Sequence, residues 1–257
     1  MRYFIKFAYN GEKFHGWQSQ PNAVSVQQEI EEALSIVMRL PVSVTGAGRT
    51  DAGVHAREMY AHFDTPFSID NKDRLLLSLN RLLGKDIAIY DVIPVKEDAH
   101  ARFDAYERTY KYFVTFEKTP FLYPYCWHSP SRLDIDKMNE AASTLLDVDD
   151  FTSFAKLHSD AKTNICDVRK AYWNIIDKDC DSSFLNLFND GIVFTISADR
   201  FLRNMVRAIV GTLVDVGRGK LSLDNFKDII VKKDRCSAGT SMPAHGLFLW
   251  EVKYKYL

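Results

Sequence analysis

Apolar and polar positions alternate along the first hundred residues in patterns that predict strands and helices in turn. Short runs rich in aromatic and β-branched residues are typical of strands, whereas apolar residues three or four positions apart are typical of helices. The expected segments are a strand over 2–9, a helix over 25–40, strands over 42–47 and 59–64, a helix over 70–82 and a strand over 86–95. This order is that of the split βαβ, or ferredoxin-like, arrangement, in which helices cover one face of an antiparallel sheet.

The rest of the chain alternates in the same way, beginning near Ala105. The expected segments are strands over 106–116, 168–176, 184–188, 192–197 and 247–254, and helices over 134–146, 201–216 and 222–232. The joint at 100–104 contains no glycine or proline, so the two sheets are expected to be continuous. We therefore expect an α+β protein of two ferredoxin-like halves, residues 1–104 and 105–257, that share an extended, mainly antiparallel sheet with a central cleft.

Polar residues mark where the helices should begin. Ser25 and Gln28 fit a capping box, in which the hydroxyl and the amide each satisfy a free backbone donor. Asp70, Asp134 and Ser222 precede three further helices, where a side-chain oxygen can accept from the first turn. The sequence therefore predicts helix starts at these four places.

Length and composition change this picture little. The chain has 257 residues, of which 46% are hydrophobic and 26% charged, as is ordinary for a globular protein. The sequence contains no membrane-spanning run of apolar residues, and residues 1–7 form too short an apolar segment for a signal peptide. Cysteines at 126, 166, 180 and 236 form no C-x-x-C pair, so buried free thiols are expected. The expected location is the cytoplasm.

The net charge of −1 argues weakly against a nucleic-acid-binding protein, because such proteins are usually basic. The charge is unevenly distributed, however. The segment 200–235 holds 9 basic and 4 acidic residues, which is a local net charge of +5. Binding depends on where charge lies, so one basic face could still hold an acidic partner. The candidates for that face are Arg200, Arg203, Arg218, Lys220, Lys232, Lys233 and Arg235.

The most unusual segment is 45–56, where three glycines and three alanines leave little to bury. It contains one acid, Asp51, and the arginine Arg49 two positions before it. An aspartate beside an arginine stays ionised and can act as a nucleophile or a base. The alternative is a tight loop in which Asp51 caps its own turn, and spacing alone favours that alternative.

Several other functions are disfavoured because their motifs are missing. No Gly-Lys-Ser/Thr follows these glycines, as a P-loop requires, and Asp51 stands where a dinucleotide fingerprint needs its third glycine. The sequence also lacks the motifs of a zinc deaminase and of a hydrolase nucleophile elbow. The seven histidines show no tight metal-ligand spacing, so no metal is expected.

The segment 48–56, Gly-Arg-Thr-Asp-Ala-Gly-Val-His-Ala, resembles the signature of the TruA-type tRNA pseudouridine synthases. Other segments resemble further motifs of this family in the family's order, so the resemblance spans nearly the whole chain. These segments are 9–11, 14–20, 25–27, 100–103, 108–112, 151–154, 201–207, 209–213, 215–220 and 243–247. Two positions depart from the family pattern: Asn10 replaces the usual aspartate, and 240–243 replaces a more common Ala-Pro form.

The resemblance implies an enzyme that isomerises uridine to pseudouridine in transfer RNA, at positions 38, 39 and 40 of the anticodon arm. By motif position, Asp51 is the catalytic acid group, Arg207 pairs with it, and Tyr110 stacks on the target base. Arg49 would fill the space of the extruded nucleotide or hold its phosphate. The basic segment 200–235 is then the expected contact with RNA. The resemblance also implies a homodimer, and neither a metal nor an organic cofactor.

Each of these assignments has an alternative. Tyr110 lies in an expected strand and could be a core residue, and Arg207 could belong to a solvated basic helix face. The aromatic and amide side chains of the loop 14–20 could contact RNA or pack on the sheet. For the whole protein, the alternatives are an RNA-binding module without catalysis and a metal-dependent hydrolase. The first is disfavoured by the presence of Asp51, and the second by the missing ligands.

Overall fold

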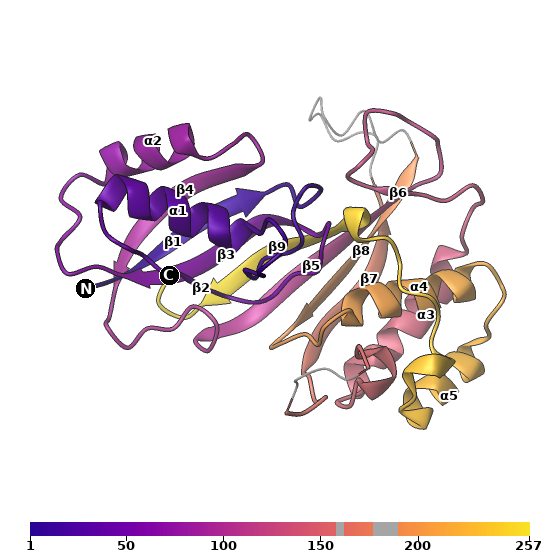
Figure 1. Ribbon diagram of the computed structural model, residues 1–257. Coiled ribbons are helices and arrows are strands. Elements are labelled where there is room, and N and C mark those ends of the chain that lie inside the picture. Colours follow the sequence, from indigo (N-terminus) through magenta and orange to yellow (C-terminus); the bar gives the residue numbers. More distant parts are fainter. Residues whose placement is uncertain (158–161, 177–189) are drawn as a thin grey trace. The chain divides into compact units, whose positions relative to one another are not determined.

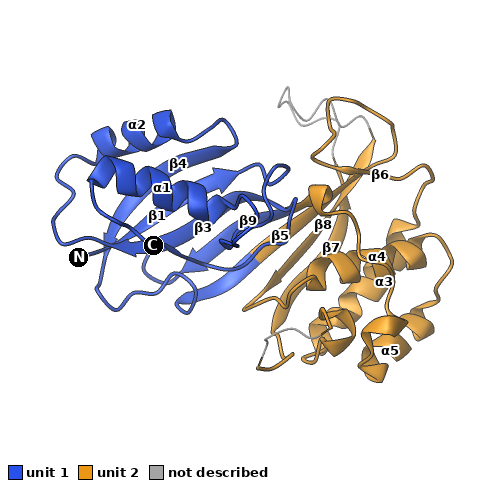
Figure 2. Ribbon diagram, in the orientation of Figure 1, with its two compact units in different colours: residues 1–108, 248–257 blue, residues 109–247 orange. Residues whose placement is uncertain are grey.

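The computed structural model describes residues 1–157, 162–176 and 190–257. The chain is a mixed α+β protein whose strands form a mixed sheet (Figure 1). Backbone proximity divides it into two compact units, which Figure 2 colours separately. Unit 1 comprises Met1–Arg108 and Phe248–Leu257, and unit 2 comprises Thr109–Leu247. The predicted strand 184–188 lies outside the described residues.

Unit 1 begins with the predicted alternation of strands and helices, which is confirmed. Its elements are β1 (Arg2–Tyr9), α1 (Val26–Met38), β2 (Thr45–Gly46), β3 (His55–Asp64), α2 (Lys72–Leu82), β4 (Ile87–Val95) and, from the end of the chain, β9 (Leu247–Tyr254). The strand order is β4-β1-β3-β9, and β2 also pairs with β3. β1 is antiparallel to both of its neighbours, whereas β3 and β9 run parallel. α1 and α2 lie side by side on one face of these strands (Figure 1).

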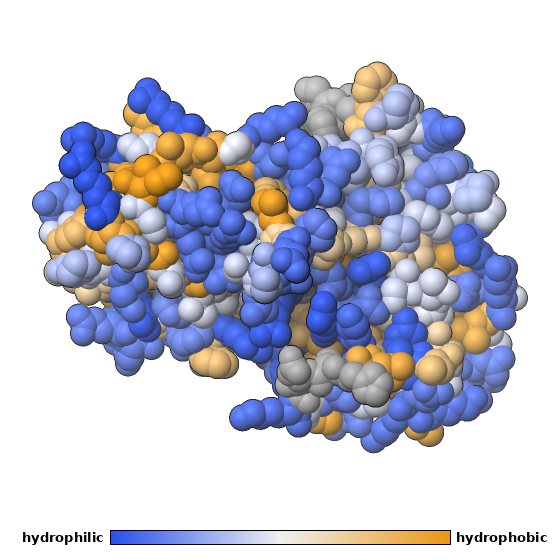
Figure 3. Space-filling view, in the orientation of Figure 1, coloured by the Kyte–Doolittle hydropathy of each residue, from blue (hydrophilic) through white to orange (hydrophobic). Residues whose placement is uncertain are grey.

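The core of unit 1 forms because alternate residues of β1 and one face of α1 are apolar. Ile5, Phe7 and Ile30 are completely buried there. Burial of a side chain of this size contributes about 1.5–3 kcal/mol. Some apolar residues remain on the outer side of the helices, as Figure 3 shows over α1 and α2, and Ile36 and Leu77 are each more than half exposed.

Unit 2 is built around the long buried helix α4. Its elements are most of β5 (Ala105–Thr115), β6 (Trp127–His128), α3 (Ile135–Ser143), η1 (Thr144–Asp147), η2 (Thr152–Phe154), β7 (Val168–Ile175), β8 (Gly191–Ala198), α4 (Met205–Gly217), α5 (Leu223–Lys232), η4 (Arg235–Ser237) and η5 (Ala244–Gly246). The strand order is β5-β8-β7, and β6 pairs with β5. α3 packs against both β7 and α4, and nearly every residue of α4 is buried.

The predicted helix starts at Ser25, Asp134 and Ser222 are confirmed. Each of these side chains accepts a hydrogen bond from a backbone N–H in the first turn of the helix that follows. Only one bond of the predicted capping box is observed, since the side-chain amide of Gln28 donates to Glu32 in the next turn. Local capping chemistry therefore places these three starts correctly.

The start predicted at Asp70 is wrong by one residue. Asn71 caps α2 by accepting the N–H of Arg74 at 2.8 Å, whereas Asp70 accepts the hydroxyl of Ser68 at 2.7 Å. Aspartate and asparagine are both good caps, so two such residues in a row cannot be ranked from the sequence.

The strand predicted over 42–47 is much shorter, because side chains of α1 occupy its backbone groups. Ser35 accepts the N–H of Val42, and Glu31 accepts the N–H of Val44, both at 2.9 Å. A backbone donor bonded to a side chain cannot also join a strand ladder. Pairing with β3 therefore begins only at Thr45.

The helix predicted over 201–216 begins four residues later, at Met205. Asn204 has a φ of 65°, which is a left-handed conformation that a continuing right-handed helix cannot contain. Its side-chain amide donates to Ser241 at 2.6 Å, which is a partner from a distant part of the chain. Arg203 therefore precedes α4 and is not part of that helix, although the predicted helix 201–216 included it.

The compact units differ from the expected halves, 1–104 and 105–257, mainly at the end of the chain. The final strand, β9, pairs in parallel with β3, so that Phe248 lies opposite His55. Its residues from 248 onward consequently belong to unit 1. Pairing between such distant segments leaves no local pattern in the sequence, so the order of elements around the joint at 100–104 could not reveal it.

Candidate active site

Asp51 lies in the loop 48–54, which joins β2 to β3 in unit 1. The residue is half-buried, and its backbone carbonyl accepts the N–H of Val54 at 3.2 Å, which closes a turn. Gly53 has a φ of +78° in this turn, a conformation that side chains with a Cβ disfavour. Arg49 is exposed. The small residues of this segment thus form a tight turn that presents one acid.

The end of β1 and the segment that follows it hold this loop at several points. The hydroxyls of Tyr9 and Thr50 are hydrogen-bonded at 2.8 Å. The N–H of Trp17 donates to the carbonyl of Thr50 at 3.4 Å, and the N–H of Gly53 donates to the carbonyl of Phe14 at 3.2 Å. The loop is therefore anchored both before and after its carboxylate.

Two glycines allow the two segments to approach this closely. A Cβ on Gly16, whose φ is +89°, would lie 2.4 Å from the carbonyl oxygen of Thr50. A Cβ on Gly11 would lie 2.0 Å from the carbonyl oxygen of Val54. Both distances are far inside van der Waals contact, so only glycine fits at either position. Gly11 and Gly16, which lie in two segments that resemble family motifs, thus serve the Asp51 loop directly.

His55 connects the end of this loop to the core of unit 1. It is 1% exposed, and its Nδ1 accepts the N–H of Gly11 at 3.0 Å. An accepting ring nitrogen carries no proton, so Nδ1 is the unprotonated nitrogen. The ring also stacks on Phe248 of β9 with centroids 4.6 Å apart. His55 therefore has a structural role in this unit.

Some residues of the loop 14–20 pack on the sheet, and others face solvent. Phe14 and Trp17 are buried, and the ring of Trp17 stacks on Phe7 at 5.4 Å. His15 and Gln18 are exposed. The aromatic residues of this loop thus pack on the sheet, and only its polar residues face solvent.

Asn10, which departs from the family pattern, keeps a local turn. Its side-chain oxygen accepts the N–H of Glu12 at 3.1 Å. Asparagine and aspartate can both accept this bond, so the substitution removes a charge and preserves the turn.

Tyr110 lies on β5 in unit 2 and is half-buried. Two residues further along the strand, on the same face, Tyr112 is completely buried. The ring of Tyr110 meets that of Phe201 edge to face, with centroids 5.0 Å apart. Tyr110 therefore lies at the margin of the core, held by an aromatic contact.

Arg207 lies in the first turn of α4 and is bound to the segment 239–243. Its Nε donates to the carbonyl of Met242 at 2.6 Å, and the N–H of Met242 donates to the carbonyl of Arg207 at 3.1 Å. Gly211, one turn along the helix, lets this segment approach, because a Cβ there would lie 1.9 Å from the carbonyl oxygen of Thr240. The segment 239–243 thus orients the guanidinium of Arg207. This segment lies outside α4, so the helical pattern in the sequence does not reveal it.

The basic residues expected to contact RNA have different surroundings. Arg203, Lys220 and Lys232 are exposed. Lys233 is also exposed, but it pairs with Asp150 at 2.8 Å, and the hydrogen bond to this carboxylate raises the pKa of the ammonium. The positive charge of Lys233 is therefore already paired with the carboxylate of Asp150.

Known proteins are similar to this chain over nearly its whole length. A family model described as tRNA pseudouridine synthase matches residues 141–255. The tRNA pseudouridine synthase A of Parabacteroides distasonis is 56% identical over 253 residues, which cover 98% of this chain and 96% of that protein. The proteins of the same name from Bacteroides fragilis and Bacillus subtilis are 54% and 38% identical over 98% and 99% of this chain. The chain belongs to the tRNA pseudouridine synthase A family.

The family resemblance seen in the sequence is therefore confirmed. The matched family model includes Arg207 but neither Asp51 nor Tyr110. The full-length relatives extend the similarity over almost the entire chain. Membership of the family thus rests on both units.

Several residues that support the loop were not singled out by their chemistry in the sequence. Tyr9 and Thr50 are 41 positions apart, and no periodicity links them. Arg108 donates to the carbonyl of Ala47, just before the loop, at 3.1 Å. The only sequence signal for Tyr9 and Arg108 is that both lie in segments resembling family motifs.

The described residues contain no cluster of three or more histidine, cysteine, aspartate or glutamate side chains placed to hold a metal ion. Burial raises the pKa of Cys126 to about 11 and that of Cys166 to about 12, so both thiols stay protonated at neutral pH. Cys236 is exposed, and Cys180 lies outside the described residues. Each helix in the described ranges is too short or too polar to cross a membrane.

Proposed function

We propose that this chain isomerises uridine to pseudouridine in the anticodon arm of transfer RNA, at positions 38, 39 and 40. In this reaction the bond between N1 of the base and C1′ of the ribose breaks, and a bond between C5 and C1′ forms. The proton on C5 is lost, and N1 gains a proton. Electrons balance within the nucleotide, so the proposed reaction needs neither a metal nor an organic cofactor.

The observation that carries the proposal is the anchored loop around Asp51 in a member of this family. The loop is hydrogen-bonded to the end of β1 and to the segment after it, on both sides of the carboxylate. Attack on the sugar, attack on the base and abstraction of a sugar proton all require an ionised carboxylate at a fixed position. We therefore assign Asp51 as the catalytic acid group.

We assign the remaining site residues by motif position. Tyr110 is proposed to stack on the target base, a role supported by its partial exposure and by the edge contact that orients its ring. Arg207 is proposed to pair with Asp51, which would orient the carboxylate and keep it ionised. Arg49, an exposed residue of the same loop, is proposed to fill the space of the extruded nucleotide or hold its phosphate.

We propose that Arg203, Lys220, Lys232 and Lys233 contribute to contacts with RNA phosphates. The exposure of all four supports this role. From the family resemblance we also propose two ferredoxin-like halves, a homodimer and a cytoplasmic location. Sedimentation at several protein concentrations tests the dimer.

The decisive experiment incubates the purified protein with an unmodified tRNA transcript and maps pseudouridine by chemical adduct. We expect adducts at uridines of the anticodon arm, and the same yield after dialysis against a chelator when the RNA is folded beforehand. Binding of the transcript without any adduct would instead indicate an RNA-binding module. The absence of both would overturn the proposed function.

A further inference from the structure

We propose that Tyr9 and Thr50 form a positioning pair for the catalytic carboxylate. Neither side chain is assigned to contact the substrate. Their hydroxyls bond to each other at 2.8 Å, and Thr50 is the residue immediately before Asp51. The proposal rests on the proposed function, because it assigns the pair to the reaction that Asp51 performs.

Tyr9 is suited to this role because it is part of a rigid strand. It is 4% exposed and ends β1, the strand that pairs on one side with β3 and on the other with β4. Its ring stacks on that of Phe7, with centroids 6.2 Å apart, and its hydroxyl also reaches the sulfur of Met59 at 3.7 Å. A hydroxyl fixed in this way provides an immobile reference point for a surface loop.

Thr50 makes this bond at the point where the loop turns. Its backbone carbonyl accepts the N–H of Trp17 at 3.4 Å, and its side chain bonds to Tyr9. On the far side of the carboxylate, Gly53 donates to the carbonyl of Phe14. Of these three bonds, only the one between Tyr9 and Thr50 joins two side chains. It can therefore be removed without altering the backbone.

The chemistry explains why such a bond matters to the rate. The carboxylate acts on one atom of a nucleotide, and a displacement of about 1 Å can cost about 100-fold in rate. Loss of a single hydroxyl loosens the loop without releasing it, because the backbone bonds remain. We therefore expect a loss of about tenfold in turnover from either hydroxyl.

The test measures single-turnover pseudouridine formation at saturating tRNA for Tyr9→Phe, Thr50→Val and the double variant. Phe keeps the ring of Tyr9, and Val keeps the shape of Thr50. We expect each single variant to lose about tenfold in turnover with an unchanged tRNA dissociation constant. We expect the double variant to be no slower than the slower single variant, because both changes remove one bond. Thr50→Ser retains the hydroxyl and should recover most of the rate.

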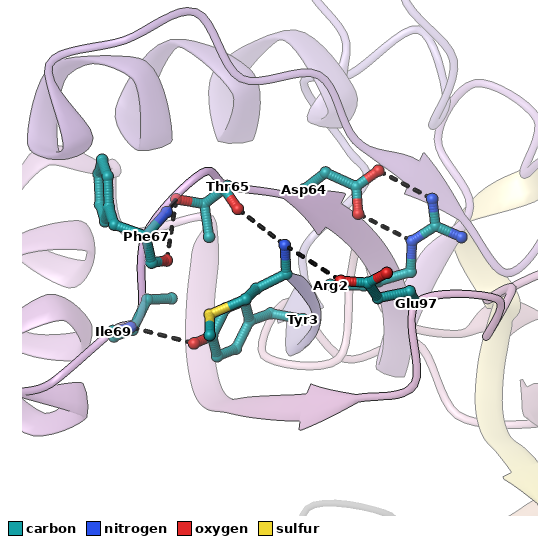
Figure 4. A network of polar contacts seen from close by, with 8 residues as sticks. Arg2, Tyr3, Asp64, Thr65, Phe67, Ile69 and Glu97 are labelled. Atoms are coloured by element: carbon teal, nitrogen blue, oxygen red, sulfur yellow. Dashed lines mark hydrogen bonds and ion pairs between the residues drawn. The ribbon is translucent and has the colours of Figure 1, made fainter.

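Tyr3→Phe is the matched control. Tyr3 lies on the same strand and is 7% exposed, and its hydroxyl accepts the N–H of Ile69 at 3.0 Å (Figure 4). This variant also loses one bond of a buried tyrosine hydroxyl, but at a site remote from the Asp51 loop. It should lower the melting temperature to a similar extent as Tyr9→Phe and leave turnover unchanged.

The outcomes separate this inference from the proposed function. An active parent whose Tyr9→Phe and Thr50→Val variants turn over at the parent rate overturns the positioning role alone. Equal losses of turnover in Tyr3→Phe and Tyr9→Phe overturn it as well, because the effect would then be one of stability. Additive losses in the double variant contradict a shared bond. A parent that forms no pseudouridine overturns the proposed function itself.

Discussion

At the scale of single residues, neighbours in this chain can have opposite surroundings. Trp17 is 4% exposed and stacks on Phe7, whereas Gln18 is exposed. Replacing Trp17 therefore tests the packing that supports the loop of Asp51, and replacing Gln18 tests a contact with RNA. The sequence alone did not distinguish the surroundings of Trp17 and Gln18, because aromatic and amide residues together suggested one shared role.

The first prediction concerns Asp51 itself. Asp51→Asn keeps the shape of the side chain and removes only its ionisable group. We expect pseudouridine formation to fall to a trace, while the free energy of unfolding and the tRNA dissociation constant stay nearly unchanged. Single-turnover assays, denaturant unfolding and tRNA binding titrations measure these three quantities. Substantial conversion of uridine by this variant would show that Asp51 is not the catalytic group.

The second prediction concerns a buried histidine of β3. His62 accepts the N–H of Ala101 at Nδ1, with the two nitrogens 3.2 Å apart. Burial lowers its pKa from 6.5 to about 4, and the nearby Arg2 and His100 act in the same direction. Between these values the unfolded chain binds a proton that the folded chain does not bind. Above pH 6.5, His62 should therefore not lower the free energy of unfolding. As the pH falls towards 4, it should lower this free energy by up to ~3 kcal/mol.

Denaturant unfolding at several pH values between 7 and 4 checks this prediction. His62→Asn is the control, because it keeps an acceptor in the region of Nδ1 and cannot titrate. The variant should lose less stability than the parent over this range. Identical pH dependences of the free energy of unfolding would exclude His62 as the source. The pKa of His100 is also lowered by burial, so both proteins should retain some decline.

At the scale of elements, α4 depends on a segment far from it in the sequence. Residues 239–243 lie against this helix, where Gly211 allows the close approach of Thr240 and Met242 accepts the bond from Arg207. The N–H of Gly239 adds a bond to the hydroxyl of Thr212 at 2.9 Å. α4 and the segment 239–243 thus pack together and orient Arg207.

The third prediction follows from that packing. Gly211→Ala places a Cβ 1.9 Å from the carbonyl oxygen of Thr240, so the segment must move. We expect the free energy of unfolding to fall by about 1–3 kcal/mol, as is typical of overpacking, and turnover to fall because the acceptor of Arg207 shifts. Gly84→Ala is the control, since no atom lies within 4 Å of its added Cβ. Parent-like turnover and stability in Gly211→Ala would contradict this account.

At the scale of the whole molecule, a net charge of −1 must be reconciled with the polyanionic substrate that we propose. Affinity for RNA comes largely from phosphate neutralisation, which depends on local charge. Lys232 and Lys233 are adjacent in the sequence, yet only Lys233 has its charge matched by Asp150. The count of basic residues in 200–235 therefore overstates the charge available to RNA.

The fourth prediction concerns the salt dependence of tRNA binding. Lys232→Glu should weaken binding and reduce the slope of log K against log salt by about 0.7–0.9 for each phosphate that the variant no longer neutralises. The matched reversal Lys233→Glu should change the slope less, because Asp150 already pairs with that ammonium. Turnover at saturating tRNA should change little in both variants, whereas Arg207→Ala should abolish turnover and barely alter the slope. Titrations from low to moderate salt measure these slopes.

An unchanged slope in Lys232→Glu would place the RNA path elsewhere. The exposed polar residues of the loop 14–20 are then the next candidates, since His15 and Gln18 face solvent. A slope that changes equally in both lysine variants would contradict the role given to Asp150.

The sequence by itself determined the order and type of the elements in unit 1, three of the helix starts and the family. Each of these depends on residues close together in the chain. The spacing of Ile30 and Leu34 predicts one helix face, and Ser25 caps the same helix through its own first turn. Periodicity and capping act within a few positions, so they remain visible without the fold.

Only the tertiary structure decided where β2 and α4 begin, to which unit β9 belongs and what holds Asp51. These features depend on hydrogen-bond donors and acceptors from distant segments of the chain. Glu31 takes a backbone donor just before β2, Ser241 holds Asn204 before α4, and Tyr9 fixes Thr50 beside the carboxylate. The sequence proposes Asp51 as the acid, but the partners that position its loop are brought together only by the folded chain.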